Sequence, residues 1–417
     1  MRRLSLYTAL AGLLAVSAYG CAVEGSSEGP EGTDPLESEQ NYIAILSSSS
    51  TATAEADTER LAAEYGFKVE ATWAHVLQGI KMTATPDVVA ALAADPEVAY
   101  IEPDGLTVID DDVCDLVPDL PACDCEAFPT SPFCGDPVPE PGEPGEPGQP
   151  GEPGEPGQGG EIIPPGIEFV GGPIAATDKI AWIIDSGIDL DHPDLNVDVG
   201  LSTFFTGNSP EDEFQGQGGG HGTRVAGIIA AIDNDIGVVG VSPGNTVVSV
   251  RTQGANGAGA VSALVAGINY VVENGTPGDV INMSVSAVGQ FQSLEDAVLS
   301  AAAKGFRFAL SAGNAAQDVD ASSTVPAKVN HPNVFTVSAI GPDGCLADFS
   351  NFGLSVDLSG PGVDIVSTAI GGGIGAPVNG TSFSAPLVAG LLLHKTPVSR
   401  GTACGDPDGK PDPLASF

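Results

Sequence analysis

The sequence predicts an α/β fold, a doubly wound and mostly parallel sheet preceded by a small α+β domain of the ferredoxin-like type. From residue 161 onwards, short apolar runs alternate with longer segments of helical periodicity, the pattern of a parallel sheet that carries helices on both faces. Residues 41–105 are instead ordered as strand, helix, alternating stretch, helix and strand, which fits a split βαβ sandwich.

The elements of the small domain each have a local signal. Strands are expected at 42–46, within 69–83 and at 98–101, and a helix at 54–65. A second helix is expected after Thr85, an N-cap residue followed by Pro86 at the first helical position. This domain has no clustered nucleophile and base, and its composition alone also fits an independent scaffold domain.

Two low-complexity segments flank this domain. Residues 22–40 are small and acidic, which predicts a disordered leader. Residues 106–160 are acidic without a basic side chain, and glycine recurs at every third position from Gly142 to Gly160. That run is too short for a collagen triple helix, so we expect an extended spacer rising about 3.1 Å per residue.

The larger domain, residues 161–395, is predicted from alternating buried strands and helices. Strands are expected at 179–184, 247–250, 280–284, 306–311 and 334–340, and helices at 222–232, 261–272, 294–303 and 382–393. A short polar tail, residues 396–417, follows. Asp185, Ser284 and Asn314 lie at or just past strand ends, where sites gather in such sheets.

Charge and the N-terminal residues point to an exported protein. The formal net charge of −41 argues against nucleic-acid binding, because phosphate groups would be repelled. In residues 1–21 two arginines precede an apolar run and then small residues, which predicts a signal peptide. Residues 17–21 are similar to a bacterial lipoprotein signal with Cys21 as the lipidated residue; ordinary cleavage nearby is the alternative, and Tyr19 fits the lipoprotein signal poorly. The expected localisation is therefore extracellular, or the bacterial outer membrane if Cys21 is lipidated.

The remaining six cysteines predict disulfides, because their number is even and the chain is expected to be exported. They are Cys114, Cys123, Cys125, Cys134, Cys345 and Cys404. A zinc site in the four-cysteine cluster is not expected, because Cys123 and Cys125 are separated by only one residue.

Four segments carry residues suited to acyl transfer. Asp185 closes the first strand of the larger domain, and His221 opens a helix in Gly-His-Gly-Thr. Asn314 ends Ser-Ala-Gly-Asn, and Ser382 follows Asn-Gly-Thr at a helix start. Acyl transfer needs a base that reaches the serine, a carboxylate that holds the imidazole and a donor for the oxyanion. Each residue alone also fits a turn or a helix cap, but their joint occurrence favours catalysis.

Through these motifs, residues 161 to about 394 resemble the subtilisin-like serine proteases, and the order Asp, His, Ser is that of subtilisin itself. The resemblance implies that Asp185 stabilises the imidazolium and that His221 acts as general base and then acid. It further implies that Ser382 attacks the scissile carbonyl and that Asn314 donates to the oxyanion.

The resemblance also implies a substrate groove and a calcium site. The substrate would lie as an added strand beside Ser284, Val285, Ser286, Ser311, Ala312 and Gly313. Ser286 stands where the family usually has glycine, so a narrower pocket is expected. Calcium ligands would be Glu161, Asp194, Asn234 and the carbonyls of Ile236 and Val238. A solvated acidic turn is the alternative at the calcium position.

Residues 41–105 resemble the inhibitory prodomain of these proteases, whose tail occupies the substrate groove until it is removed. Here the spacer separates that tail from the larger domain, and self-cleavage is expected between Gly105 and Gly160. The chain departs from the family at Arg224, Phe383 and Leu387, which replace histidine, methionine and histidine, and by its short C-terminus.

A bridge between Cys345 and Cys404 is one of fifteen pairings that six cysteines allow, and we expect it to hold the C-terminal tail. The predicted function is that of an exported serine endopeptidase, which is made as a self-inhibited precursor and acts as a monomer on proteins or peptides. The alternatives are a catalytically silent protein that keeps the groove for binding and a surface adhesin built on the collagen-like segment.

Overall fold

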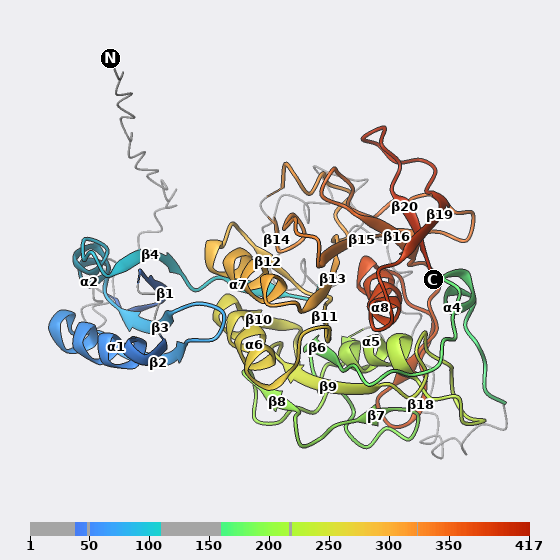
Figure 1. Ribbon diagram of the computed structural model, residues 1–417, viewed down its shortest axis with the longest axis horizontal. Helices are drawn as coiled ribbons and strands as arrows, with labels where there is room; N and C mark the ends of the chain where they lie inside the picture. The colour runs from blue at the N-terminus through green and yellow to red at the C-terminus, as the bar shows by residue number, and fades with distance from the viewer. Residues whose placement is uncertain (1–37, 48–50, 110–159, 217–218, 323) are drawn as a thin grey trace, which may run out of the picture. The chain divides into compact units, whose positions relative to one another are not determined.

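The computed structural model describes residues 38–47, 51–109, 160–216, 219–322 and 324–417 (Figure 1). The predicted signal peptide with Cys21, most of the leader and most of the spacer lie outside these residues, as do Cys114, Cys123, Cys125 and Cys134. Within the described residues, no helix is long and apolar enough to cross a bilayer.

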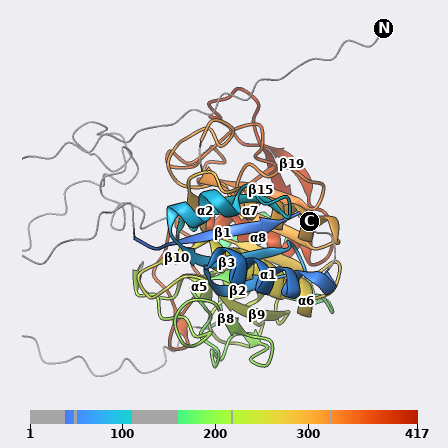
Figure 2. The ribbon, with the colours of Figure 1, turned by 90° about the vertical axis from the view of Figure 1, so that its left-hand side faces the viewer.

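The N-terminal domain has the predicted ferredoxin-like order. Its elements are β1 (Gln40–Leu46), α1 (Thr51–Tyr65), β2 (Lys68–Trp73), β3 (Gly79–Ala84), α2 (Pro86–Leu92) and β4 (Val98–Pro103). The strands form an antiparallel sheet in the order β2-β3-β1-β4, and Figure 2 shows α1 and α2 in front of it. As predicted, Thr85 caps α2, accepting a hydrogen bond from the backbone N–H of Val88 at 3.5 Å.

The larger domain contains the predicted doubly wound sheet. Its long strands are β6 (Ala181–Asp185), β9 (Thr246–Arg251), β11 (Val280–Met283), β13 (Arg307–Ser311), β15 (Val334–Ile340) and β16 (Leu358–Pro361). Short strands β7 (Asn196–Val197) and β8 (Thr203–Phe204) pair with β9, and β17 (Thr368–Ala369) pairs with β18 (Gly373–Ile374). The main sheet runs in the order β19-β20-β16-β15-β13-β11-β6-β9-β7, where β19 is Val398–Thr402 and β20 is Pro413–Ser416. Its central pairings are all parallel.

The described residues of this domain form five helices, which are α4 (Pro165–Phe169), α5 (His221–Ala230), α6 (Val261–Asn274), α7 (Gln292–Ala303) and α8 (Thr381–Leu392). Alternate residues of β6 enter two different cores: Trp182 and Ile184 pack with α6 and α7, whereas Ala181 and Ile183 pack with α5 and α8. Figure 1 shows the two helix pairs on opposite sides of β6, β11 and β13. Burial of both faces explains why these strands are apolar throughout.

A separate sheet contains a strand that sequence reasoning assigned to the spacer. Leu106–Val108 forms β5, which lies between β10 (Ala258–Ala260) and β12 (Ser286–Val288), and β14 (Thr324–Val325) completes the sheet. The N-terminal domain therefore continues past residue 105 into the larger domain.

The C-terminal tail also differs from the expectation of a short polar segment. Val398–Thr402 and Pro413–Ser416 form β19 and β20, which pair antiparallel, and β20 extends the main sheet by pairing parallel with β16. The predicted bridge between Cys345 and Cys404 is present and joins this hairpin to the loop after β15. The tail thus covers the edge of β16, which would otherwise present unpaired backbone groups.

Replacing Cys345 and Cys404 together by serine should lower the free energy of unfolding by about 2–4 kcal/mol, because the bridge spans 59 residues and restricts the unfolded chain. The measurement is denaturant unfolding in a Ser382→Ala background, which removes the predicted nucleophile and hence self-digestion. The parent protein in reductant is the matched control and should lose the same stability. An unchanged denaturation midpoint, or a free Cys404 thiol in peptide mapping, would contradict the assignment.

Candidate active site

The parallel sheet brings the four predicted catalytic side chains to one edge. Asp185 is the last residue of β6, and His221 is the first residue of α5. Asn314 lies three residues after the end of β13, and Ser382 is the second residue of α8. Carboxyl ends of strands and amino ends of helices meet there, as the fold requires.

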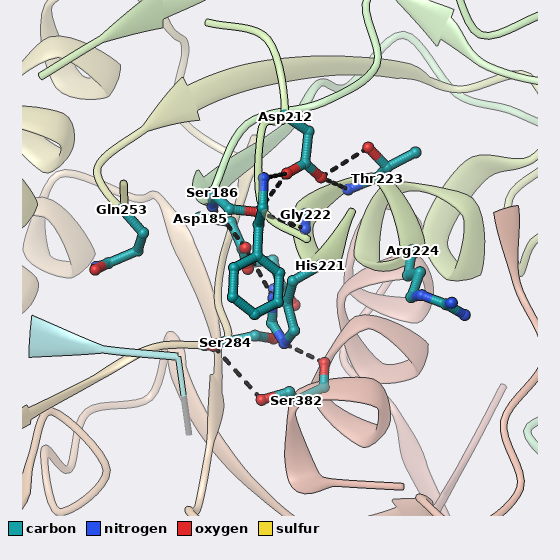
Figure 3. A network of polar contacts seen from close by, with 12 residues as sticks. Asp185, Ser186, Asp212, His221, Gly222, Thr223, Arg224, Gln253, Ser284 and Ser382 are labelled. Carbon is teal, nitrogen blue, oxygen red and sulfur yellow. Dashed lines mark hydrogen bonds and ion pairs between the residues drawn. The ribbon is translucent and has the colours of Figure 1, made fainter. Parts of the chain in front are cut away.

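A buried hydrogen bond joins His221 and Asp185. The distance between His221 Nδ1 and Asp185 Oδ1 is 2.8 Å, and both side chains are inaccessible to solvent. Because a carboxylate only accepts, the imidazole carries a proton on Nδ1, and Nε2 is the acceptor in its neutral form. Figure 3 shows His221 between Asp185 and Ser382.

Two aromatic rings enclose the imidazole of His221. Its ring centroid lies 5.3 Å from that of Phe383 and 6.3 Å from that of Phe214. Phe383 and Phe214 are buried, so these contacts keep water from the imidazole and strengthen its interaction with Asp185.

Ser382 is buried at the amino end of α8. Its Oγ lies 3.5 Å from the carbonyl oxygen of Ser284, and Ser284 Oγ donates to the Ser382 carbonyl at 2.8 Å. These contacts fix the serine next to the first predicted groove residue. The helix amino end also favours negative charge developing there.

The side-chain amide of Asn314 is oriented by the first residue of α8. Asn314 Oδ1 accepts hydrogen bonds from the backbone N–H of Thr381 at 2.8 Å and from its Oγ1 at 3.0 Å. Thr381 Oγ1 also accepts from the backbone N–H of Gly313 at 3.0 Å. Since the amide oxygen is held in this way, the NH₂ group lies on the opposite edge of the amide, which is the geometry an oxyanion donor needs.

Sequence reasoning missed a buried carboxylate, Asp212, that joins the two catalytic segments (Figure 3). Its Oδ1 accepts from Ser186 Oγ at 2.9 Å, and its Oδ2 accepts from the Thr223 backbone N–H at 2.9 Å and from Thr223 Oγ1 at 2.8 Å. Ser186 Oγ in turn accepts from the backbone N–H of Gly222 at 3.0 Å. Burial raises the pKa of Asp212 to about 6.

This network couples the position of Asp185 to that of His221, because Ser186 and Gly222 are their chain neighbours. Only glycine fits at Gly222: a Cβ there would lie 2.1 Å from the carbonyl oxygen of Gly187. No spacing in the sequence marks Asp212, because its partners are set by the fold. We interpret Asp212 as a positioning residue.

The predicted groove residues are all buried and lie along two edges. Ser284 and Val285 precede β12 and Ser286 begins it, while Ser311 ends β13 and precedes Ala312 and Gly313. On the first edge, Ser286 pairs with Val108 of β5, and Ala258 pairs with the same residue from the other side. Residues 106–108 thus lie as an added strand beside Ser286, but their other neighbour is β10, which was not among the predicted groove residues.

Hydrogen bonds connect the segments that carry the five predicted calcium ligands. Ile162 pairs with Val238 in a parallel bridge. Glu161 Oε1 accepts from the backbone N–H of Asn234 at 2.6 Å, and Asp194 Oδ2 accepts from the backbone N–H of Val238 at 3.1 Å. Asn234 Oδ1 accepts from the backbone N–H of Ile236 at 3.2 Å.

Asp194 carries the feature that fits a cation. It is 1% exposed, and its Oδ1 is buried without a hydrogen-bond partner among the described residues. Burial and the neighbouring Glu161 raise the pKa of Asp194 to about 6. Within the described residues, no group of three or more His, Cys, Asp or Glu side chains is placed to hold a metal. The set here has two carboxylates, and its other oxygens are an amide and carbonyls, donors that suit Ca²⁺.

The departures from the family pattern fall in the packed interior. Arg224 is fully buried and donates to the carbonyl oxygens of Gly219 at 3.3 Å and Ala376 at 2.9 Å. Phe383 and Leu387 belong to the core that contains α5 and α8. An apolar cavity of about 310 Å³ beside α4 and α8 contains none of the predicted site residues.

Comparison with known proteins identifies the family. Residues 179–396 match the model of the subtilase family. Subtilisin amylosacchariticus of Bacillus subtilis subsp. amylosacchariticus is 40% identical over 222 residues, which are 52% of this chain and 56% of that protein. Subtilisin of Bacillus pumilus is also 40% identical, over 52% of this chain and 78% of that protein.

A crystal structure of a cold-adapted subtilisin-like serine proteinase shares 30% identity over 51% of this chain and 73% of that chain, with a TM-score of 0.42. The chain spans a little over half the length of several of the subtilisins it matches, including subtilisin E of Bacillus subtilis (strain 168) at 56%. The match covers the segment that holds Asp185, His221, Asn314 and Ser382, and this chain belongs to the subtilase family.

Proposed function

We propose that this protein is a serine endopeptidase that is made as a self-inhibited precursor and exported. The proposed catalytic activity rests on the buried 2.8 Å contact between His221 Nδ1 and Asp185 Oδ1, and on the position of Ser382 at the start of α8. Export is supported by the signal-like residues 1–21 and by the acidic composition.

In this mechanism His221 Nε2 takes the proton of Ser382 Oγ as the oxygen attacks the scissile carbonyl. Asp185 stabilises the imidazolium that forms. The imidazolium then protonates the leaving amine, and a water molecule, activated by the same base, hydrolyses the acyl-enzyme. The side-chain amide of Asn314 and the Ser382 backbone N–H would bind the oxyanion; losing the corresponding amide in subtilisin costs about 10²–10³ in rate.

A fluorophosphonate should label the processed protein at Ser382, because the reagent forms a bond only with an activated serine. The measurement is mass spectrometry of the labelled peptide, with Ser382→Ala as the control that should remain unlabelled. The catalytically silent binding protein is the competing function. Folded, processed protein that stays unlabelled would support that alternative and contradict the endopeptidase.

Self-inhibition is supported by the position of β5, which fills the groove between β10 and β12. Ile109 continues this strand, and its backbone N–H donates to the carbonyl oxygen of Gly257 at 3.0 Å. Since residues 106–109 already occupy the groove, we place the self-cleavage beyond Ile109 and before Gly160. Ser382→Ala protein should stay uncut there.

Two carboxylates of the N-terminal domain cap helices of the larger domain. Glu102 accepts from the backbone N–H groups of Gln292 at 3.0 Å and Ser293 at 3.2 Å, at the start of α7. Asp104 accepts from the backbone N–H of Ser262 at 2.9 Å and from its Oγ at 2.6 Å, at the start of α6. Neither helix has a side-chain cap at its own N-cap residue, so the caps hold the N-terminal domain in place.

Apolar contacts reinforce this docking. Ile43, Trp73 and Val76 of the N-terminal domain belong to the same core as residues of α6 and α7. Tyr100 Oη also donates to Asp296 of α7 at 2.7 Å. The N-terminal domain therefore fits the role of an intramolecular inhibitor.

Replacing Glu102 and Asp104 together by alanine should speed dissociation of the cleaved N-terminal domain by about 10- to 30-fold, because each lost cap costs about 1 kcal/mol. The measurement is release of this domain from the larger one after processing of the full chain. Glu55→Ala with Glu59→Ala is the matched control, because both residues are exposed on α1. Equal release rates in the two double variants would contradict the capping role.

We also propose that Glu161, Asp194, Asn234 and the carbonyls of Ile236 and Val238 hold a structural calcium ion. The buried, unpartnered Asp194 Oδ1 supports this site. A bound cation would supply the positively charged partner that this oxygen lacks, and it would tie the amino end of the larger domain to the loop of residues 233–238.

Chelation should lower the melting temperature of Ser382→Ala protein by several degrees, because an ion that binds only the folded state stabilises it by mass action. The measurement is a thermal melt with calcium and with chelator. In Glu161→Gln protein the difference between the two melts should shrink. A melt of the parent protein that does not respond to chelator would rule out the site.

A further inference from the structure

We propose that Gln253 makes this enzyme select substrates with a hydroxyl side chain at the groove position that Thr107 occupies. This inference rests on the proposed endopeptidase function, and it specifies the class of peptide that the groove accepts. The selected pattern is threonine or serine, any residue, and then an aliphatic residue.

The side chains of Thr107 and Gln253 face each other inside the groove. Thr107 pairs with Gly259 of β10 on one side and with Ala287 of β12 on the other. Its Oγ1 donates to Gln253 Oε1 at 3.2 Å, and Gln253 Nε2 donates to Thr107 Oγ1 at 3.0 Å. Both residues are 0% exposed.

Backbone contacts fix Gln253 so that its amide is aimed at this position. Its N–H donates to the carbonyl oxygen of Asp185 at 3.2 Å, and its carbonyl oxygen accepts from Arg251 Nε at 3.1 Å. Gly259 leaves the space that the contact needs. A Cβ at Gly259 would lie 2.6 Å from Gln253 Oε1 and 2.8 Å from Thr107 Oγ1.

A hydroxyl group is the simplest partner for this amide, because one oxygen donates to Oε1 and accepts from Nε2. Valine has the shape of threonine but satisfies neither amide atom. A carboxylate accepts from Nε2 but cannot donate to Oε1, and its charge would be buried. A buried polar site that hydrogen-bonds a substrate hydroxyl therefore discriminates against the analogue without it.

The neighbouring positions have a different character. Ile109 is fully buried and belongs to the same apolar cluster as Phe214 of the active site. Leu106 is 39% exposed, so we expect this groove position to select less strongly among substrate side chains. Thr107 and Ile109, two residues apart, thus enter a polar and an apolar part of the groove.

Matched peptides test the selection. The parent peptide has the sequence of residues 104–113, and one variant replaces the threonine at position 107 by valine. The mature enzyme should cleave the valine peptide with a kcat/KM about 10- to 100-fold lower, the range expected when buried polar atoms lose their partner. A serine peptide should be cleaved nearly as well as the parent. A peptide with valine at position 106 is the control and should change kcat/KM little.

The Gln253→Leu enzyme separates selection from a structural role. Its preference should reverse, so that the valine peptide becomes the better substrate. If Gln253 only supported the fold, the variant would cleave all peptides more slowly in the same ratio, and this would overturn the proposal.

The outcomes also separate this proposal from the proposed function. An enzyme that a fluorophosphonate labels, but that cleaves the threonine and valine peptides equally or cleaves neither, overturns the selection and leaves the endopeptidase assignment intact. An enzyme that neither labels nor cleaves contradicts the endopeptidase assignment itself.

Discussion

The insertion of β5 between β10 and β12 joins the two domains of this protein. Its backbone pairings place Ile109 against the active-site cluster and bring Thr107 to Gln253. Glu102 and Asp104 directly precede β5 in the chain, and they lie at the starts of α7 and α6. The position of this three-residue strand is therefore linked to the helix caps and to the apolar contacts between the domains. Its side chains also indicate how a substrate would lie in the groove.

The active site depends on buried polar groups that hold one another. Asp212 accepts hydrogen bonds from the segments that follow Asp185 and His221 and so links β6 to α5. Thr381 performs a similar role on the other side, because it holds both Asn314 and the backbone of Gly313. Such networks are rigid when every member has a partner, and this rigidity gives the positional accuracy that acyl transfer requires.

Much of the architecture was predictable from local patterns. Strand β6 is apolar at both alternating sets of positions because both faces of the sheet are covered, and this signal is visible in a single sequence. Thr85 with Pro86 marked the start of α2 through capping chemistry alone. The candidate catalytic residues could be predicted because each lies in a short motif at a strand end or a helix start.

The features that the sequence did not reveal depend on partners far along the chain. Residues 106–108 become a strand only because β10 and β12 flank them, and Gln253 meets Thr107 across 146 residues. The hairpin of β19 and β20 depends on its pairing with β16 and on the Cys345–Cys404 bridge. The Cys345–Cys404 bridge was predicted, but the strand pairings and the contact of Gln253 with Thr107 have no local sequence pattern.

Hydrogen–deuterium exchange of Ser382→Ala protein tests most directly whether β5 occupies the groove. Two forms are compared: the full chain, and the larger domain after active enzyme has cut away the residues before Gly160 and the released N-terminal domain has been removed. The backbone N–H groups of β10 and β12 should exchange slowly in the full chain and much faster once β5 is gone, because their pairing partner is lost. Equal exchange of these strands in both forms would contradict the account.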